Sequence, residues 1–244
     1  MTVVKNELRE NILKAFKQNK SLNEISRKFK INKTTAFYWY RKLGKSKIKK
    51  VKINQNDVEL VGEFIGIFAG DGNYYRDKNY KHNITIHITG KDKKYITHVK
   101  ALMANLFSKE PHIFVRKKGN MTLIRITSKD VYLFLKNYLN WENKKSFSVC
   151  LKKGTQNYPI DFLKGFVRGL FDTDGMIKRS IPRFVFGTIS SKLATNVENV
   201  LLMLDIRYTK NIVVDKRKNR KPMVLIEIFR RDANLFLKNI NPIH

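Results

Sequence analysis

An internal repeat restricts the possible folds of this chain more than any other feature of its sequence. The segment LIRITSKDVYLFLKN at 123–137 is similar to LIEIFRRDANLFLKN at 225–239. Upstream, FIGIFAGDG at 64–72 pairs with VRGLFDTDG at 167–175 at nearly the same separation. We therefore expect a tandem pseudo-dimer, with a first half at 59–150 and a second half at 151–244.

Each half predicts the same order of elements, αββαββα, and thus an α+β fold. The alternation of isoleucines with polar residues over Asn83–Thr89 predicts a strand whose isoleucines face the helices. A middle helix is expected over 92–107 in the first half and over 192–204 in the second. The last helix should begin near Asp130 or Asp232. The opposite, polar sheet faces are left for a ligand, and two such sheets side by side form a basic saddle.

Glycines recur every four residues in the helix that precedes each Asp-Gly pair. They are Gly62, Gly66 and Gly70 in the first half, and Gly165 and Gly169 in the second. At this spacing they lie on one helix face and let two backbones approach closely. Each helical glycine costs about 1 kcal/mol of propensity, and close packing is the expected compensation. We therefore expect Gly66 to meet Gly169 across a pseudo-twofold axis.

Such packing brings Asp71 and Asp174 together at the C-terminal ends of their helices. Two carboxylates are unfavourable there, because like charges repel and the helix dipole is negative at that end. A divalent cation relieves the repulsion, and Mg²⁺ prefers carboxylate, carbonyl and water oxygens. Paired acids at a symmetric centre suit metal-assisted phosphodiester hydrolysis. For one motif alone, the alternative is a helix that ends in a tight Asp-Gly turn; two motifs in register argue against it.

The segments at 64–72 and 167–175 resemble the two motifs of the LAGLIDADG homing endonucleases, and the resemblance covers about residues 59–244. It implies site-specific double-strand cleavage of DNA with Mg²⁺ or another divalent cation, as in intron homing. It also implies that Asp71 and Asp174 are catalytic, metal-binding acids. The backbone carbonyls of Gly70 and Thr173 are further metal ligands by the same resemblance.

The family resemblance assigns a catalytic lysine less directly than it assigns the two aspartates. Lys144, after the last helix of the first half, resembles the family's basic residue near the scissile phosphates, and the second half has no counterpart. In so basic a chain, a solvated or phosphate-contacting role is the alternative. Asp172 does not match a metal ligand of the family, and we expect it to be solvated or to cap a helix.

Several basic or polar residues on the outward strand faces, or next to the strands, are candidate DNA contacts. They are Arg76, His87, Lys91, Arg116, Lys118, Arg125, Arg183, Lys192, Arg217 and Arg220. For His87, a structural role is the alternative to DNA contact. Because Glu227 matches Arg125 in the repeat, we expect the two halves to contact different bases in a non-palindromic site.

Residues 1–43 are expected to form a small domain of three short helices. Ser21 to Glu24 is a capping box, and the segment 21–43 resembles a helix-turn-helix. The resemblance implies DNA contacts from the start of the third helix, by Lys33, Thr34, Thr35 and Tyr38. Lys30 stands where the turn usually has glycine, at a cost on the order of 1 kcal/mol. A stabilising or dimerising module is the alternative, and residues 44–58 are expected to be a basic linker.

The formal net charge is +30, from 50 Lys and Arg against 20 Asp and Glu. Such an excess favours a nucleic-acid partner, because each phosphate contact releases a counterion. No long apolar run, basic amphipathic helix or lipidation motif indicates a membrane. A single cysteine, Cys150, suggests a reducing, intracellular location, either cytoplasmic or nucleoid-associated. Because both motifs lie in one chain, we expect a monomer.

The sequence therefore predicts a site-specific double-stranded DNA endonuclease with an N-terminal helix-turn-helix. One alternative is a DNA-binding transcription regulator of the same architecture that has lost catalysis. Another is an intron-splicing maturase, which would bind RNA. The basic charge does not separate DNA from RNA.

Overall fold

The computed structural model describes residues 6–18, 20–42, 51–90, 92–116, 120–142, 144–178, 183–214 and 221–243. The chain forms two compact units, Met1–Lys50 and Val51–His244. Within the described ranges, none of the helices has the length and apolar character needed to cross a membrane.

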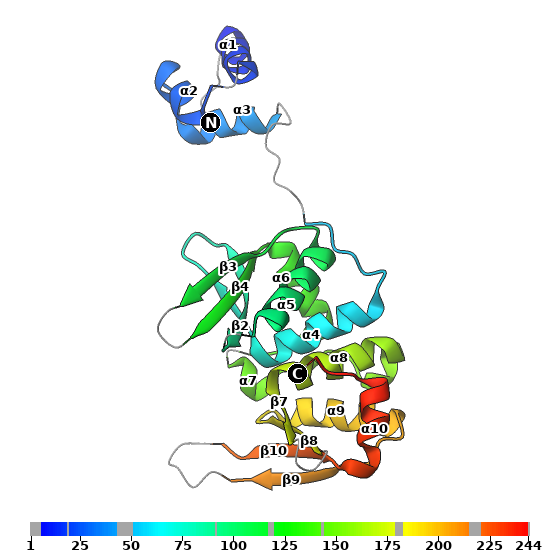
Figure 1. The fold of residues 1–244 in the computed structure, drawn as a ribbon. Coiled ribbons are helices and arrows are strands. Elements are labelled where there is room, and N and C mark those ends of the chain that lie inside the picture. Colours follow the sequence, from blue (N-terminus) through cyan, green and yellow to red (C-terminus); the bar gives the residue numbers. More distant parts are fainter. Residues whose placement is uncertain are drawn as a thin grey trace. The chain divides into compact units, whose positions relative to one another are not determined.

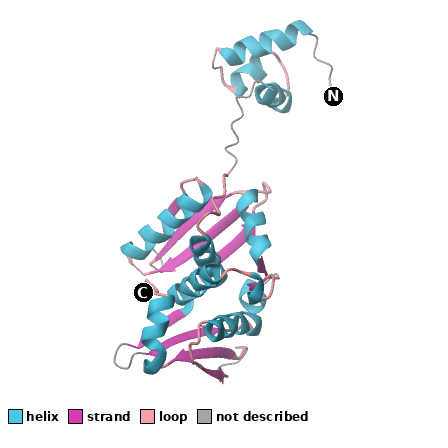
Figure 2. Cartoon of the chain, turned by 90° about the vertical axis from the view of Figure 1, so that its right-hand side faces the viewer, coloured by secondary structure: helices cyan, strands magenta, loops and turns pink. Residues whose placement is uncertain are grey.

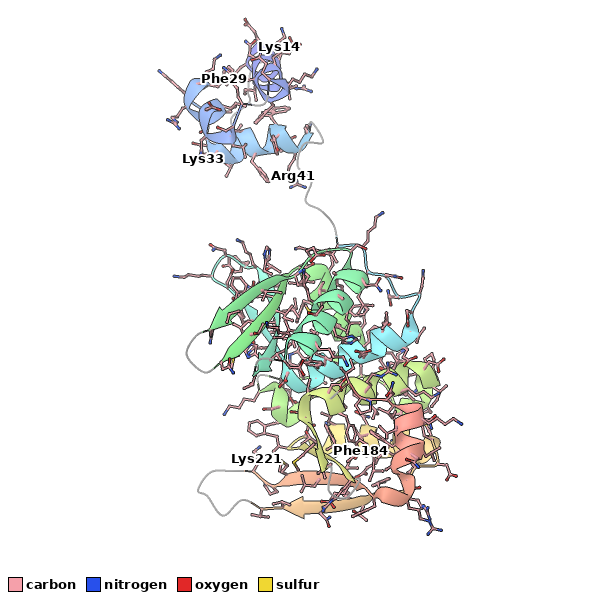
Figure 3. All side chains as sticks on the ribbon, in the orientation of Figure 1. Lys14, Phe29, Lys33, Arg41, Phe184 and Lys221 are labelled. Atoms are coloured by element: carbon pink, nitrogen blue, oxygen red, sulfur yellow. The ribbon has the colours of Figure 1, made fainter. Side chains whose placement is uncertain are left out.

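The first unit consists of three helices around a small apolar core. They are α1 (Asn6–Lys17), α2 (Leu22–Lys28) and α3 (Lys33–Lys42). The expected capping box starts α2: Ser21 Oγ accepts from the Glu24 N–H, and the Glu24 carboxylate accepts from the Ser21 N–H at 2.7 Å. Lys30, between α2 and α3, has a φ of 48°. This residue therefore adopts the left-handed conformation for which the motif usually has glycine. Figure 3 labels Lys33 and Arg41 near the two ends of α3.

The second unit contains the two halves, and both have the expected order αββαββα (Figure 1). The first half contains α4 (Val58–Asp71), β1 (Gly72–Arg76), β2 (His82–Thr89), α5 (Lys93–Phe107), β3 (His112–Arg116), β4 (Met121–Thr127) and α6 (Lys129–Tyr138). The second contains α8 (Ile160–Asp174), β7 (Gly175–Lys178), β8 (Arg183–Thr188), α9 (Ser191–Met203), β9 (Thr209–Val213), β10 (Met223–Ile228) and α10 (Arg230–Asn239). Between them lie β5 (Leu139–Asn140), α7 (Lys145–Ser148), β6 (Cys150–Leu151) and a 3₁₀ turn at Thr155–Asn157. The α+β fold class is confirmed.

Each half forms a four-stranded antiparallel sheet, in the order β1-β2-β4-β3 or β7-β8-β10-β9. Figure 2 shows the helices gathered on one side of both sheets. In β2, Ile84, Ile86 and Ile88 are buried against these helices, as the alternation predicts. The opposite face of each sheet, which we call the outward face, therefore carries the residues between the core positions.

The helices α4 and α8 pack backbone against backbone, as the glycine spacing predicts (Figure 1). A Cβ atom on Gly66 would lie 2.1 Å from the Phe166 carbonyl oxygen. A Cβ atom on Gly169 would lie 2.2 Å from the Glu63 carbonyl oxygen and 3.1 Å from the Gly66 carbonyl carbon. Any side chain at either glycine would push the helices apart, so these residues allow the two Asp-Gly ends to meet.

A buried ionic cluster joins the same two helices to α5 and to the C-terminal segment. Glu63 is 1% exposed and pairs with His98 and Arg168. Arg168 also pairs with Glu59 and donates from Nε to the Ile240 carbonyl at 2.7 Å. The hydrogen bond to Glu63 raises the pKa of His98, so a positive charge is favoured beside this buried carboxylate.

Part of the predicted linker belongs to the second unit. Val51 and Ile53 pack against its core, and the Asn54 N–H donates to the Leu106 carbonyl at 2.7 Å. Asp57 caps α4 by accepting from the Leu60 N–H at 3.1 Å. Residues 51–57 are therefore structured, whereas 43–50 lie outside the described residues.

Candidate active site and DNA interface

Asp71 and Asp174 are the last residues of α4 and α8, and the glycine contacts bring these helix ends together. A Cβ atom on Gly70 would lie 2.1 Å from Thr173 Oγ1 and 2.9 Å from Asp174 Oδ2. The Asp174 carboxylate therefore lies directly against the end of α4. The expected meeting of the two acidic ends is present.

The electrostatics of the pair favour an added positive charge. Burial raises the pKa of Asp71 to about 7, and the neighbouring charge of Asp174 adds to the rise. Burial by surrounding groups also raises the pKa of Asp174, although this side chain keeps an exposed edge. Both shifts mean that the protonated, uncharged form of each carboxyl is favoured more than it would be in water.

Lys145, the first residue of α7, supplies part of this positive charge. Its Nζ donates to the carbonyls of Phe68, Ala69 and Gly70 at distances of 2.5–2.8 Å. Its ammonium thus binds the negative end of the α4 dipole. Burial lowers the pKa of Lys145 to about 8, while Asp174 and Asp71 oppose the fall.

The structure thus brings Lys145, rather than the predicted Lys144, to the acidic pair. Lys144 is exposed at the N-cap position of α7, with Nζ 5.8 Å from the ring centroid of Phe147. The sequence thus predicted the correct segment but the wrong one of its two adjacent lysines. Only the start of a four-residue helix decides which of the two lysines turns inward.

Near the end of α8, a threonine side chain bonds back to its own helix. Thr173 Oγ1 donates to the carbonyls of Gly169 and Leu170 at 3.0 and 3.1 Å. Beside it, Asp172 is 7% exposed, and its Oδ1 accepts from the Ile243 N–H at 2.7 Å. Of the two roles expected for Asp172, solvation or helix capping, solvation is therefore wrong, because this carboxylate is buried and ties the C-terminal segment to α8.

The donor set fits a divalent cation. Among the described residues, no group of three or more His, Cys, Asp or Glu side chains could hold a metal ion. Asp71 and Asp174 would therefore supply two carboxylates, with backbone carbonyls, water and phosphate completing the shell that Mg²⁺ prefers. The Gly70 carbonyl, one expected ligand, accepts from Lys145 in this structure.

A pocket of about 600 Å³ lies beside Lys145, between β1, α6 and the segment that leads to α7. Arg76 lines this pocket. In register, Arg76 is opposite His82, on the same side of the sheet as Tyr74 and Ile84. The prediction that Arg76 lies on the outward face is wrong, since this side faces the helices. Its guanidinium lies 4.7 Å from the ring centroid of Tyr80.

The outward face of the first sheet brings three predicted residues together. His87, Arg125 and Arg116 alternate with core positions along β2, β4 and β3. Arg125 Nε donates to Thr85 Oγ1 at 3.2 Å, and its guanidinium lies 4.9 Å from the ring centroid of Phe114. Burial, with the nearby charges of Arg116 and Arg125, lowers the pKa of His87. His87 is thus neutral at pH 7 and able both to donate and to accept.

The outward face of the second sheet is different. Arg183 pairs with Glu227, which is 6% exposed, on the neighbouring strand β10. Lys192 is exposed in the first turn of α9, and therefore is not on the sheet. The other predicted contacts lie outside the described residues: Lys91, Lys118, Arg217 and Arg220.

Comparisons with known proteins agree with this architecture. Residues 161–241 match the family model of the LAGLIDADG-like domain. A DNA polymerase of Thermococcus hydrothermalis is 25% identical over 180 residues, which make up 70% of this chain and 10% of the polymerase. The chain thus spans about a tenth of the length of the curated relatives that it matches.

Two solved structures share the fold of the second unit. The homing endonuclease I-DmoI, in complex with DNA and Mn, has a TM-score of 0.57 and 20% identity, over 78% of this chain and 99% of that chain. The N-terminal LAGLIDADG domain of DUF199/WhiA has a TM-score of 0.52 and 15% identity, over 78% and 86%. Other complexes of I-DmoI with DNA contain Mg or Ca.

The second unit therefore has the fold of the homing endonuclease I-DmoI and of the LAGLIDADG domain of DUF199/WhiA. The predicted resemblance to the LAGLIDADG homing endonucleases is confirmed by the match to 161–241 and by the shared fold. The helix-turn-helix character of the first unit stays a prediction.

Proposed function

We propose that the protein is a site-specific endonuclease that hydrolyses double-stranded DNA with Mg²⁺ or another divalent cation. The observation that carries the proposal is the pair of Asp71 and Asp174 at adjoining helix ends. Two neighbouring carboxyl groups whose pKa values are both raised are unfavourable in their ionised form unless a cation joins them. A protein that only bound DNA would gain nothing from this pair, because carboxylates repel phosphates.

The residues of the site divide the chemistry between them. A cation held by Asp71 and Asp174 supplies a Lewis acid for the scissile phosphate. Lys145, with a pKa of about 8, keeps its proton at neutral pH and places a positive charge beside the same site. That charge stabilises the negative charge that develops on the phosphate during hydrolysis. The charge of +30 favours DNA binding along the rest of the surface.

Cleavage of a random duplex library with Mg²⁺, followed by sequencing of the ends, tests this function. The wild-type protein should produce recurrent ends. Asp71→Asn and Asp174→Asn should abolish them while DNA binding is retained. Asp161→Asn is a matched control, because Asp161 is an exposed acid of α8 outside the pair. Recurrent ends produced by both pair variants contradict the metal assignment.

A second candidate is a DNA-binding regulator of the same architecture without catalysis. Two observations favour it: the shared fold with the LAGLIDADG domain of DUF199/WhiA, and the separate helical first unit. Selective retention of one DNA sequence by the wild-type protein, with no cleavage in Mg²⁺ or Mn²⁺, would support this candidate.

We further propose that the first unit binds DNA through the start of α3 and that the protein is a monomer. Lys33, Thr34 and Tyr38 are exposed there, and Thr35 is half-buried. Deleting residues 1–50 should weaken binding and reduce site selectivity more than it changes the salt dependence. Unchanged affinity and selectivity in the deletion variant contradict this role.

A further inference from the structure

The outward face of the second sheet carries a group of apolar residues beside the polar Thr209 and Asn211. Val224, Ile226 and Ile228 of β10 are buried against the helices, so Met223, Leu225 and Glu227 lie on the outward face. The strand register adds three further apolar residues to this face. They are Met176 of β7, Val185 of β8 and Val213 of β9.

Two opposite charges on this face pair with each other. Arg183 Nη2 binds the Glu227 carboxylate, so part of this guanidinium is already engaged and its charge is compensated before any base is contacted. In the first sheet, the position that matches Glu227 is Arg125, which uses Nε for Thr85 Oγ1. Among the ion pairs of the described residues, none involves Arg125. The first sheet thus has an arginine where the second has a glutamate in an ion pair. At the matching apolar position, Leu123 of the first sheet is 3% exposed, whereas Leu225 of the second is half-buried.

We infer that the second sheet recognises thymine-rich DNA through the C5-methyl groups of thymine, whereas the first sheet selects bases by hydrogen bonds. The inference rests on the proposed binding of duplex DNA. Thymine is the base that places a methyl group in the major groove, where it contacts apolar side chains. Leu225, Met223 and Val213 are accessible for such contacts. The Arg183–Glu227 pair removes the guanine preference that a free arginine would create.

Deoxyuridine substitution tests the inference, because deoxyuridine pairs like thymine but lacks the methyl group. Sites are first selected from random duplexes with the full chain. Thymines are then replaced in one half-site at a time, and binding is measured. Each replacement in the half-site of the second sheet should weaken binding about fourfold. Replacements in the other half-site should change it less than twofold.

Paired variants assign each half-site to its sheet. Leu225→Ala should remove the sensitivity to deoxyuridine in one half-site, while Leu123→Ala, at the matching position of the first sheet, should leave it intact. Glu227→Ala should create a preference for guanine of roughly fivefold or more, because it frees Arg183. The double variant Glu227→Ala/Arg183→Ala should lose that preference.

The possible results separate this inference from the proposed function. Selected sites without enriched thymine, or equal deoxyuridine effects in both half-sites, overturn the methyl recognition and leave the nuclease proposal intact. Failure of the wild-type protein to retain any DNA sequence overturns both.

Discussion

The two halves share one backbone plan, but their central helices end in different chemistry. At the end of α4, the Lys145 ammonium binds three carbonyls. At the end of α8, the Thr173 hydroxyl binds two carbonyls. The lysine cap carries a full positive charge next to the acidic pair, whereas the Thr173 hydroxyl bonds back to its own helix and adds no charge. A repeat can therefore preserve packing while each copy acquires its own chemical role.

The packing itself is nearly symmetric. Gly62 and Gly66 lie against the carbonyls of Phe162 and Phe166. In return, Gly165 and Gly169 lie against the carbonyls of Glu59 and Glu63. The two halves stay symmetric where their backbones touch, because a Cβ atom at any of these glycines would collide with the facing backbone. Symmetry is lost where side chains reach a ligand, as at the helix caps and on the outward faces.

The largest expected effect comes from removing the charged cap. Lys145→Met should lower the rate of cleavage by about 10²–10³-fold, the usual range for the loss of one donor that stabilises developing negative charge. Lys144→Met is the matched control and should change the rate less than twofold. Single-turnover cleavage of the selected site at saturating Mg²⁺ measures both. Equal losses in the two variants would show that general charge, and not the α4 cap, is responsible.

The next largest effect is expected from alanine substitutions at the packed glycines, which test whether the two helices contribute equally to this contact. Gly66→Ala and Gly169→Ala should each destabilise the fold by about 3 kcal/mol, because a Cβ meets backbone that cannot move aside. Gly187→Ala is the control: its Cβ would meet only flexible ends of Leu225 and Met223, at 3.1 and 3.2 Å. Urea unfolding measures all three. A cost below 1 kcal/mol at Gly66 or Gly169 would contradict the close approach.

The raised pKa of Asp71 predicts that the stability of the folded protein depends on pH. Its folded-state pKa is about 7, and the ordinary pKa of an aspartate is 3.8. Between these values the folded protein binds the extra proton, so stability falls as pH rises from about 4 to about 7. Without metal, Asp71→Asn should therefore be more stable than wild type at pH 8, by roughly 2 kcal/mol after allowance for solvent screening. The difference should disappear near pH 4.

Adding Mg²⁺ reverses this order. The cation binds the folded wild-type site and stabilises it by mass action, whereas Asp71→Asn lacks one carboxylate ligand. Urea unfolding at pH 8, with EDTA or with excess Mg²⁺, measures both states. If the variant is less stable than wild type even in EDTA, then Asp71 is not under the electrostatic stress inferred from its burial.

Regular patterns in the sequence predicted the features that depend on backbone packing. The glycine spacing gave the contact of α4 with α8, and the isoleucine alternation gave the core face of β2. In β1, the segment Asn73-Tyr74-Tyr75-Arg76 has no apolar alternation, so the side of Arg76 could not be derived. The choice between Lys144 and Lys145 depends on a single residue of register. The pairing of Asp172 with Ile243 joins residues that are distant in the sequence.

The smallest expected effect concerns that last contact, which exists in only one half. Ala69 occupies the position in α4 that Asp172 occupies in α8, and both are buried. Asp172→Ala thus gives the second helix the residue of the first. It leaves the Ile243 N–H without its acceptor, so we expect a loss of about 1 kcal/mol in urea unfolding. Asp161→Ala, on the exposed part of α8, should cost less than half of this. Faster amide exchange at Ile243 in Asp172→Ala alone would locate the loss at the C-terminal segment. Unchanged exchange there would mean that Arg168, through the Ile240 carbonyl, is sufficient to hold this segment.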